Sequence, residues 1–432
     1  MSTRVIDGAY TKLISRVPSN ASARFGAIGV VGHMMSGIKT GADGTVSVLS
    51  GSNLAGSGTW QTFDASLSGL IYEFDGFDQV VNKFGSIPEL SFNSGTYVGD
   101  GTDVSPYDPK YNLLRALELI YLANPTVRTY VAVLDGSGTT AEAGASSAGV
   151  SLALADLIKH DDISFVVGAG QEFSSTYQAH VTSASNEDNQ AERVYVGGTS
   201  LMGVMASGSK SPDLVGATQD TDWSALLDDT GRSIFYATNV IYKFQSDYKT
   251  APSGGYEIGG NQLASYLAGY LTSIPEQRSL LRQGTRFGQK YLQNNFRWSR
   301  AHQTTLVNGA VLHSKTAGGR TTYSRALTYG STSSQFRRIT TRRIVDRVIK
   351  EVRATANTYV GKDNTEIVRI GIKSSCDSKL SALARFGLIQ NGANSTVWVE
   401  GTDVADGVVR VASLFKPITE IEFVEIQLTV EL

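Results

Sequence analysis

Cysteine is almost absent from this chain, which has a single one, Cys376, in 432 residues. One thiol can form neither an intramolecular disulfide nor a cysteine cluster around a metal ion. It stands beside an apolar segment, so we expect a small buried core residue and not a nucleophile. Scarce cysteine also fits synthesis in a reducing compartment.

The chain also lacks a strong charge of either sign. Its 38 Lys and Arg residues and 40 Asp and Glu residues give a net charge of −2. Proteins that bind nucleic acid through its phosphates usually have a basic face and a high pI, so this balance argues against that class. No run reaches the ~18 apolar residues that a membrane helix needs. The first residues also lack the apolar stretch of a signal peptide. We expect no nucleic-acid partner, no membrane insertion and synthesis in the cytoplasm.

Motifs for catalysis or metal binding are missing as well. The five histidines are isolated from one another, and none belongs to an H-E-x-x-H arrangement. The chain has no G-x-S-x-G nucleophile elbow. Residues 203–211 resemble a phosphate-binding loop, but Ser209 separates the second glycine from the lysine and breaks the required spacing. We therefore expect no catalytic residue, no metal site and no cofactor.

Glycine, in contrast, is abundant, with 45 of the 432 residues, against a typical share of about 7%. Two glycine turns follow apolar strands, where a doubly wound enzyme would bind a phosphate or nucleotide. Neither completes the G-x-G-x-x-G pattern, because Ala141 and Phe173 take its last position. An α/β enzyme or nucleotide-binding protein remains the alternative function. The glycines concerned are Gly136, Gly138, Gly168 and Gly170.

Apolar strands alternate with helical patterns through the middle of the chain. This alternation predicts an α/β (mixed α+β) fold with a mostly parallel sheet core and flanking helices. Strands are expected at 27–32, 129–134, 163–167 and 191–197, and helices at 111–122, 148–159, 174–185 and 261–271.

The length predicts two or three domains, and composition divides the chain further. We expect an extended N-terminal arm and a Gly/Ser-rich outer region, partly a β insertion, with a short helix at 78–84. The α/β domain, the C-terminal domain and a terminal strand or arm follow. The boundaries are 1–24, 25–110, 111–330, 331–418 and 419–432.

The C-terminal third begins with a helix expected over 333–358. Val345, Val348, Ile349 and Val352 form its apolar stripe. Its other face is basic, which indicates either a solvated surface or an electrostatic contact with an acidic neighbour or with a segment of this same chain. We expect a strand at 366–372, a helix at 377–390 and strands at 396–400 and 408–411. The basic residues include Arg338, Arg342, Arg343 and Arg347.

The last residues, Val424–Leu432, alternate apolar and polar side chains without a break. This pattern is typical of a half-buried strand. Such a strand can pair with its own sheet or be added to the sheet of another subunit.

The order of these segments resembles the C-terminal domain of contractile phage tail sheath proteins (myovirus type). An Arg-Arg helix, a helix that ends in glycine, an Asp-Gly strand and a proline before an alternating last strand occur in the family order. The resemblance covers about residues 230–432, including the Ala-Gly helix and following proline of Leu263–Pro275. The segments are Gln335–Lys350, Ala384–Ile389, Asp406–Val411 and Phe415–Val430.

The resemblance implies a structural protein and no enzyme. Its subunits would form hexameric rings stacked helically around an inner tail tube. The sheath would assemble extended and contract when the baseplate triggers it, without nucleotide hydrolysis. The implied partners are the chain itself, the tube protein, and baseplate and terminator proteins. The location would be the virion tail, assembled in the host bacterial cytoplasm. Another phage or cell-surface shell protein is a third possibility.

The resemblance also assigns residues. The first residues and the last strand would be exchanged between neighbouring subunits, and Lys379 and Arg385 would contact an acidic patch of the tube. The residues implied in strand addition are Val5, Ile6, Val424, Ile426, Leu428 and Val430.

Overall fold

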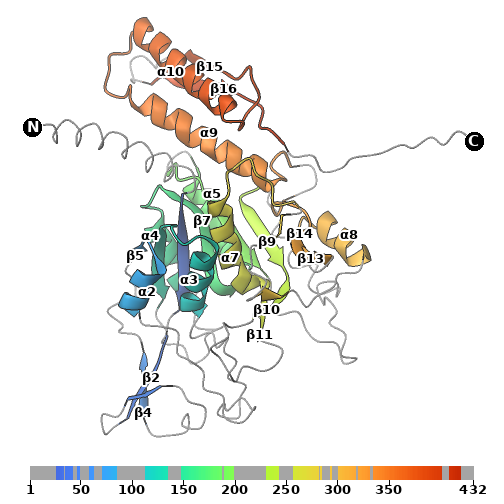
Figure 1. Cartoon of the computed structure of the whole chain (residues 1–432). Coiled ribbons are helices and arrows are strands. Elements are labelled where there is room, and N and C mark those ends of the chain that lie inside the picture. The colour runs from blue at the N-terminus through green and yellow to red at the C-terminus, as the bar shows by residue number, and fades with distance from the viewer. Residues whose placement is uncertain are drawn as a thin grey trace, which may run out of the picture. The chain divides into compact units, whose positions relative to one another are not determined.

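The computed structural model divides into two compact units (Figure 1). The N-terminal unit comprises residues 1–275 and 282–337, and the C-terminal unit comprises residues 276–281 and 338–432. The arm over 1–24, the glycines at 136 and 138, the loop at 203–211 and the strand over 424–432 lie outside the described residues. The structure describes residues 26–33, 35–41, 46–48, 58–62, 71–84, 112–134, 147–186, 189–198, 230–242, 256–281, 283–284, 292–293, 300–317, 320–330, 334–400 and 408–419.

The N-terminal unit is built on an eight-stranded sheet with the order β14-β13-β9-β8-β7-β1-β6-β5. Its inner strands are parallel, and only the edge pairs β5–β6 and β13–β14 are antiparallel. The predicted parallel sheet is thereby confirmed. The strands are β1 (Ala27–His33), β5 (Ile71–Phe74), β6 (Thr129–Leu134), β7 (Ile163–Glu172), β8 (Val194–Gly198), β9 (Ser233–Ala237), β13 (Leu312–Ala317) and β14 (Arg320–Tyr323).

Helices cover both faces of this sheet. Leu157 of α4 fills the space beside Gly29, and Leu113 of α3 fills the space beside Gly32. Because successive side chains of a strand point to opposite faces, α3 and α4 lie on opposite sides of β1. Helix α7 packs with α3, and α5 packs with α4. The helices are α2 (Phe77–Phe84), α3 (Asn112–Ala123), α4 (Ser147–Leu157), α5 (Ser175–Ala184), α7 (Gly260–Ser273) and α8 (Arg300–Asn308).

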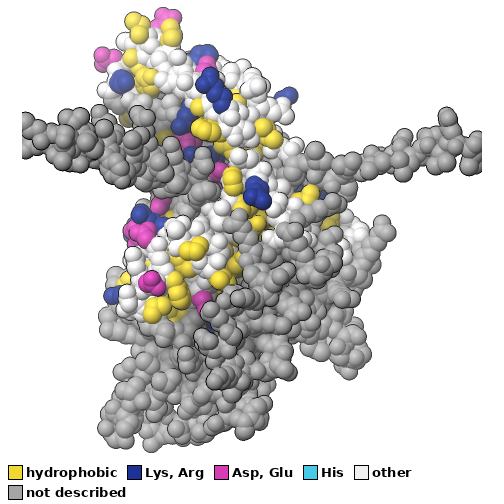
Figure 2. Space-filling view, in the orientation of Figure 1, with side chains coloured by type: hydrophobic (Ala, Val, Ile, Leu, Met, Phe, Trp, Pro, Cys, Tyr) yellow, Lys and Arg dark blue, Asp and Glu magenta, His cyan; other side chains and the backbone are white. Residues whose placement is uncertain are grey.

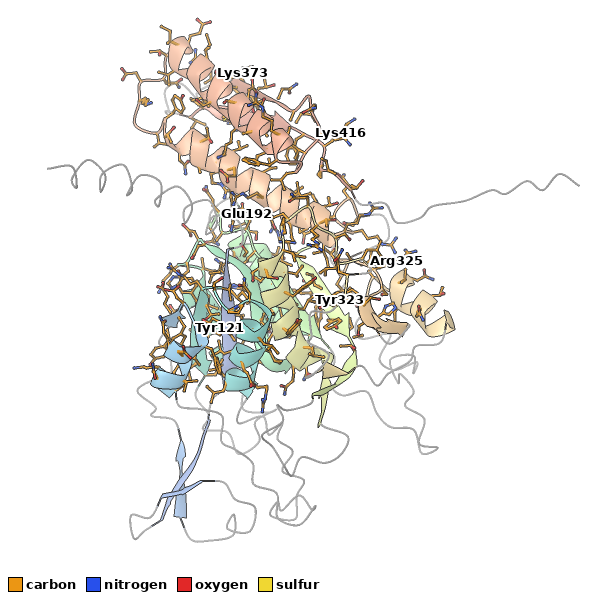
Figure 3. The ribbon with its side chains drawn as sticks, in the orientation of Figure 1. Tyr121, Glu192, Tyr323, Arg325, Lys373 and Lys416 are labelled. Carbon is orange, nitrogen blue, oxygen red and sulfur yellow. The ribbon has the colours of Figure 1, made fainter. Side chains whose placement is uncertain are left out.

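Tyr121, labelled in Figure 3, ties α3 to the edge of the sheet. Its buried hydroxyl lies 3.0 Å from the carbonyl oxygen of Phe74 in β5 and 2.9 Å from Oγ1 of Thr129 in β6. Burial raises the pKa of Tyr121 to about 12, so the hydroxyl keeps its proton. The side chain therefore holds these elements together as a neutral hydrogen-bonding group.

Short strands occur in the region where we expected loops and a β insertion. One small sheet, with the order β3-β2-β4, lies in this region. A second, with the order β11-β10-β12, lies in the segment 111–330 that we assigned to the α/β domain. The short helix predicted at 78–84 is confirmed as α2. The strands are β2 (Met35–Gly41), β3 (Val46–Val48), β4 (Gly58–Thr62), β10 (Asn239–Tyr242), β11 (Tyr256–Gly259) and β12 (Leu292–Gln293).

The C-terminal unit consists of two long helices and a two-stranded antiparallel sheet. Helices α9 (Ile339–Asn357) and α10 (Glu366–Arg385) pack together, and α10 also packs against β15 (Asn394–Trp398). Strand β16 (Arg410–Leu414) pairs with β15 (Figure 1).

The buried stripe of α9 differs from the predicted one. Ile344 and Val348 are fully buried, and Val352 packs against them, a spacing of four residues. Val345 and Ile349, which we expected in the stripe, are only half-buried. The core of this unit is completed by Leu380, Leu383, Leu388 and Ile389.

The strand predicted over 366–372 is wrong, because these residues form the first turns of α10. The hydroxyl of Thr365 accepts a hydrogen bond from the amide of Val368 and caps the helix N-terminus. Ile367 and Ile370 produced the strand-like pattern, yet their side chains are 82% and 61% exposed. The apolar positions here do not mark a buried face.

Candidate functional site

The alternative function, an enzyme or nucleotide-binding protein, depended on two glycine turns, and the second of them is part of a strand. Gly168 and Gly170 lie within β7, which runs on to Glu172. A Cβ atom at Gly168 would stand 2.9 Å from the ring of Tyr177 in α5, so a side chain covers the backbone here. The carbonyl of Gly170 accepts a hydrogen bond of 2.9 Å from Nδ2 of Asn261. Gly168 therefore serves close packing, Gly170 has a φ of 64°, which favours glycine, and no open loop is left at these two residues to hold a phosphate.

Cys376 is fully buried in α10, as expected of a core residue. Burial and the nearby charge of Asp377 raise the pKa of its thiol, which keeps it protonated. Within the described ranges, no group of three or more His, Cys, Asp or Glu side chains could hold a metal ion. None of the described helices is long and apolar enough to cross a membrane.

The basic face predicted for α9 is not a solvated surface at Arg342 and Arg343. Both side chains are buried, with 4% and 7% exposure. Arg342 forms an ion pair with Asp346 one turn later. Burial lowers the pKa of Arg343 to about 10, and the charge of Glu276 opposes this shift. These arginines thus serve contacts within the chain, one of the alternatives that the sequence left open.

Glu351 connects the two long helices. It forms an ion pair with Arg347 on α9 and a second with Lys379 on α10, where Nζ lies 2.6 Å from Oε2. Lys379, which we expected to face a tube, is thus held by α9, although 37% of its side chain stays exposed. Arg385 is exposed in the last turn of α10. Arg338 is the half-buried N-cap residue of α9.

Asp377 forms a polar contact between α10 and the small sheet. Its Oδ1 accepts a hydrogen bond of 2.6 Å from the amide of Ser395 in β15, and its Oδ2 lies 2.6 Å from Nζ of Lys373. Burial acts to raise the pKa of Asp377, but the hydrogen bonds from Lys373 and Ser395 outweigh it and lower the pKa. The carboxylate is therefore charged at neutral pH.

Many side chains of the β15–β16 sheet, polar as well as apolar, are exposed or half-buried. Along β16 exposed and half-buried residues alternate, and Leu414 is 72% exposed. Figure 2 shows Lys and Arg side chains interspersed with Asp and Glu side chains over the region of α9 and α10. The unit thus combines a small, incomplete sheet with a mixed charged surface.

A family model described as the phage tail sheath C-terminal domain matches residues 331–431. The chain carries the C-terminal domain of tail sheath proteins. This domain contains α9, the end of α10 and β16, where three of the four segments that carried the resemblance lie, and it also contains β15. A search of curated proteins finds no match.

Solved structures of sheath proteins share the fold over nearly the whole chain. The helical sheath of the anti-feeding prophage in its contracted state is 12% identical, with a TM-score of 0.58 over 94% of this chain and 92% of that one. The contracted PVC sheath of an extracellular contractile injection system is 12% identical, with a TM-score of 0.59 over 93% and 91%. The sheath tail protein from Desulfitobacterium hafniense is 10% identical, with a TM-score of 0.56 over 91% and 97%.

Both the family and these structural neighbours are structural tail sheath proteins, not enzymes. The C-terminal part of this chain therefore carries a domain of the tail sheath family, and the chain as a whole shares the fold of the sheath structures. The fold that this chain shares with the solved sheath structures includes the N-terminal unit, whereas the resemblance found in the sequence covered that unit only in part.

Sequence reasoning missed three acidic residues of the C-terminal unit. Asp377 stands four residues after Lys373, a helical spacing that the wrong strand prediction concealed. Glu351 likewise follows Arg347 by four residues, but its second partner on α10 has no signal in the sequence. Glu276 lies far from Arg343 along the chain, and only the fold brings them together.

Proposed function

We propose that this chain is the repeating subunit of a contractile tail sheath, arranged as hexameric rings stacked helically around an inner tail tube. The observation that carries the proposal is the family match of residues 331–431, the region that holds the small exposed sheet. Neighbours of the same fold form sheaths in a contracted state, which supports the same assembly here.

Strand addition between subunits gives the sheath its connections in this proposal. The β15–β16 sheet has two strands of five residues each, and α10 packs against β15 and supports it. Among residues 334–400 and 408–419, β15 is the one strand that pairs with β16, and the other edge of β16 can accept an extended segment of another subunit. The donors are the alternating segment Val424–Leu432 and the N-terminal arm with Val5 and Ile6. In the donated C-terminal strand, Val424, Ile426, Leu428 and Val430 share one face.

The inner tube is contacted by the basic residues of α10. Arg385 is the primary contact because it is exposed at the helix end. Lys379 has part of its charge balanced by Glu351, so its contribution is smaller. An acidic patch on the tube is the matching partner.

Contraction needs no nucleotide in this proposal. The extended and contracted sheaths are two packings of the same subunits, and the free energy comes from the difference between their interfaces. The baseplate triggers the change, and a terminator closes the far end of the sheath. The sheath assembles in the cytoplasm of the host bacterium and becomes part of the virion or virion-like tail.

Deletion of Val424–Leu432 tests this function. We expect the truncated chain to remain a folded monomer and to form no tubes, because it has lost its donated strand. Circular dichroism with thermal melting reports folding, and negative-stain electron microscopy reports tubes. An unfolded truncated chain would place this strand in its own core. Tubes formed by a folded truncated chain would show that the strand does not connect the subunits.

A further inference from the structure

Two Asn-Gly pairs occur in the chain, one at Asn308 and Gly309 and the other at Asn391 and Gly392. Asparagine is among the residues that degrade with heat and time. Its side-chain amide carbon is most open to the next backbone nitrogen when that residue is glycine, because glycine has no Cβ atom in the way. The reaction also depends on how the fold holds this nitrogen, and the two pairs lie in different surroundings.

The second Asn-Gly pair lies in a bulge of the C-terminal unit, between α10 and β15. An antiparallel bridge between Ile389 and Pro417 fixes one end of the bulge. The β15–β16 ladder, which begins with the pair Asn394–Leu414, fixes the other end. Four residues, 390–393, thus face only two residues in the opposite segment. Extra residues in a ladder are left without cross-strand pairing.

Asn391 and Gly392 are both exposed in this bulge. Among the described residues, neither the side chain of Asn391 nor the amide of Gly392 has a hydrogen-bond partner. Gly392 has a φ of 94°, which favours glycine, and a Cβ atom there would meet nothing within 4 Å. The backbone nitrogen of Gly392 and the side-chain carbon of Asn391 are therefore adjacent in the chain and open to water.

The first Asn-Gly pair lies instead at a hydrogen-bonded helix end. Asn308 is the last residue of α8. The amide of Val311 donates to the carbonyl oxygen of Leu306 at 2.8 Å, so this hydrogen bond closes the chain around Asn308 and Gly309. The backbone here must open before the nitrogen of Gly309 can reach the side chain of Asn308.

A third asparagine is also followed by a small residue, but the next nitrogen is occupied. Asn394 begins β15, and the amide of Ser395 donates to Oδ1 of Asp377 at 2.6 Å. The nearby carboxylate disfavours loss of the amide proton, which the reaction requires. Of these three asparagines, only Asn391 is thus followed by a nitrogen that the described structure leaves open.

We propose that Asn391 is a site of spontaneous covalent modification, where the asparagine is converted to isoaspartate and aspartate. The nitrogen of Gly392 loses its proton to water or hydroxide and attacks Cγ of Asn391, so that a C–N bond forms and the Cγ–Nδ2 bond breaks. Nδ2 leaves as ammonia with a proton from water. Water then adds to either carbonyl of the cyclic imide and opens the ring. The inference does not rest on the proposed function.

Both products change the bulge. Aspartate places a negative charge next to Gln390, whose amide donates to the carbonyl oxygen of Lys416 at 2.8 Å (Figure 3). Isoaspartate also inserts one carbon atom into the main chain between the Ile389–Pro417 bridge and the β15–β16 ladder. Because both ends of the bulge are fixed, the longer main chain must strain the pairs beside it. We therefore expect the isoaspartate form to melt at a lower temperature.

Peptide mass spectrometry of the full chain, incubated while folded at mildly alkaline pH, tests the proposal. Trypsin cleaves after Arg385 and Arg410, so Asn391 and Asn394 lie in one peptide and are compared directly. A sample digested without incubation gives the background. We expect Asn391 to show the mass change of NH2 replaced by OH, in two products that chromatography separates. It should react roughly tenfold faster than Asn308, or more, because hydrogen bonds there must open first.

The rate should also rise with pH, because the backbone nitrogen attacks only after it loses its proton. Incubation in urea gives the reference, since the two Asn-Gly pairs should react alike once the fold is lost. Equal rates at Asn391 and Asn308 in the folded chain would overturn the proposal. So would an Asn391 that reacts in urea and stays unchanged in the folded chain.

Two variants at the same exposed position separate the consequences of the reaction. Asn391→Gln closes the corresponding ring far more slowly and should keep its melting temperature after the same incubation. Asn391→Asp, measured fresh, has the new charge without the extra carbon atom in the main chain. We expect the incubated unmodified chain to melt below both variants. If Asn391 has reacted and the chain still melts as incubated Asn391→Gln does, the predicted strain on the ladder is wrong.

Discussion

At the scale of single residues, the N-terminal unit contains a buried Arg193 whose side chain is fully enclosed. Its guanidinium donates to the carbonyl oxygens of Leu157, the last residue of α4, and of His160, just beyond it, each 3.0 Å away. It also lies 3.4 Å from Nε2 of His180. The cation thus satisfies carbonyl groups that the helix end leaves without partners. The neighbouring imidazole can accept from it only while neutral.

This arrangement predicts a pH dependence of stability. Burial and the charge of Arg193 lower the pKa of His180 from 6.5 to about 3. The unfolded chain therefore binds a proton at a higher pH than the folded chain. The free energy of unfolding should fall as the pH drops from about 6.5 towards 3, by up to ~1.4 kcal/mol per pH unit from this group. Above pH 6.5 the contribution is complete and constant.

Urea unfolding of the His180→Gln variant at several pH values checks this prediction. Glutamine does not titrate, so the fall in stability below pH 6.5 should be smaller than in the unmodified chain. An identical slope in both proteins would contradict the assignment of the shift to His180.

At the scale of helices and strands, the sequence predicted the inner sheet well. Strands such as β6 are buried on both faces and apolar except for Thr129, so their pattern of apolar residues reflects their buried position. The first half of α10 was wrongly predicted as a strand because Ile367 and Ile370 are apolar and exposed, whereas its second half was predicted as a helix. The sequence left open whether Arg342 and Arg343 are solvated or buried, because their carboxylate partners, not their own hydropathy, make burial possible.

The crossing of α3 and α7 depends on Gly269. A Cβ atom there would stand 2.6 Å from the carbonyl oxygen of Ile120 and 3.0 Å from Cβ of Ala123. Gly269→Ala should therefore push the helices apart and lower the free energy of unfolding by roughly 1–3 kcal/mol. Thermal or urea unfolding measures the loss.

Gly76→Ala is the matched control for this substitution, because a Cβ atom at Gly76 meets nothing within 4 Å. We expect it to unfold as the unmodified chain does. Equal stability of the Gly269→Ala variant would mean that α3 and α7 do not approach each other as closely as described.

At the scale of the whole molecule, the account predicts which cation meets the tube. Arg385→Glu reverses an exposed charge at the end of α10 and should weaken binding to an acidic tube surface, most strongly at low salt. Lys362→Glu is the charge-matched control, since Lys362 is also exposed and lies over the ring of Tyr359.

Co-sedimentation of the sheath protein with purified inner tube measures this difference. We expect Arg385→Glu to reduce the bound fraction and Lys362→Glu to leave it near that of the unmodified chain. Equal losses in both variants would indicate a general effect of charge and no specific contact at Arg385.

The central claim is that this chain polymerises into a sheath, and electron microscopy of the purified protein tests it most directly. A concentration series, with and without the inner tube as a template, should show hollow tubes with a regular axial repeat above a threshold concentration. Single small particles at every concentration, with the tube present as well as absent, would contradict the account.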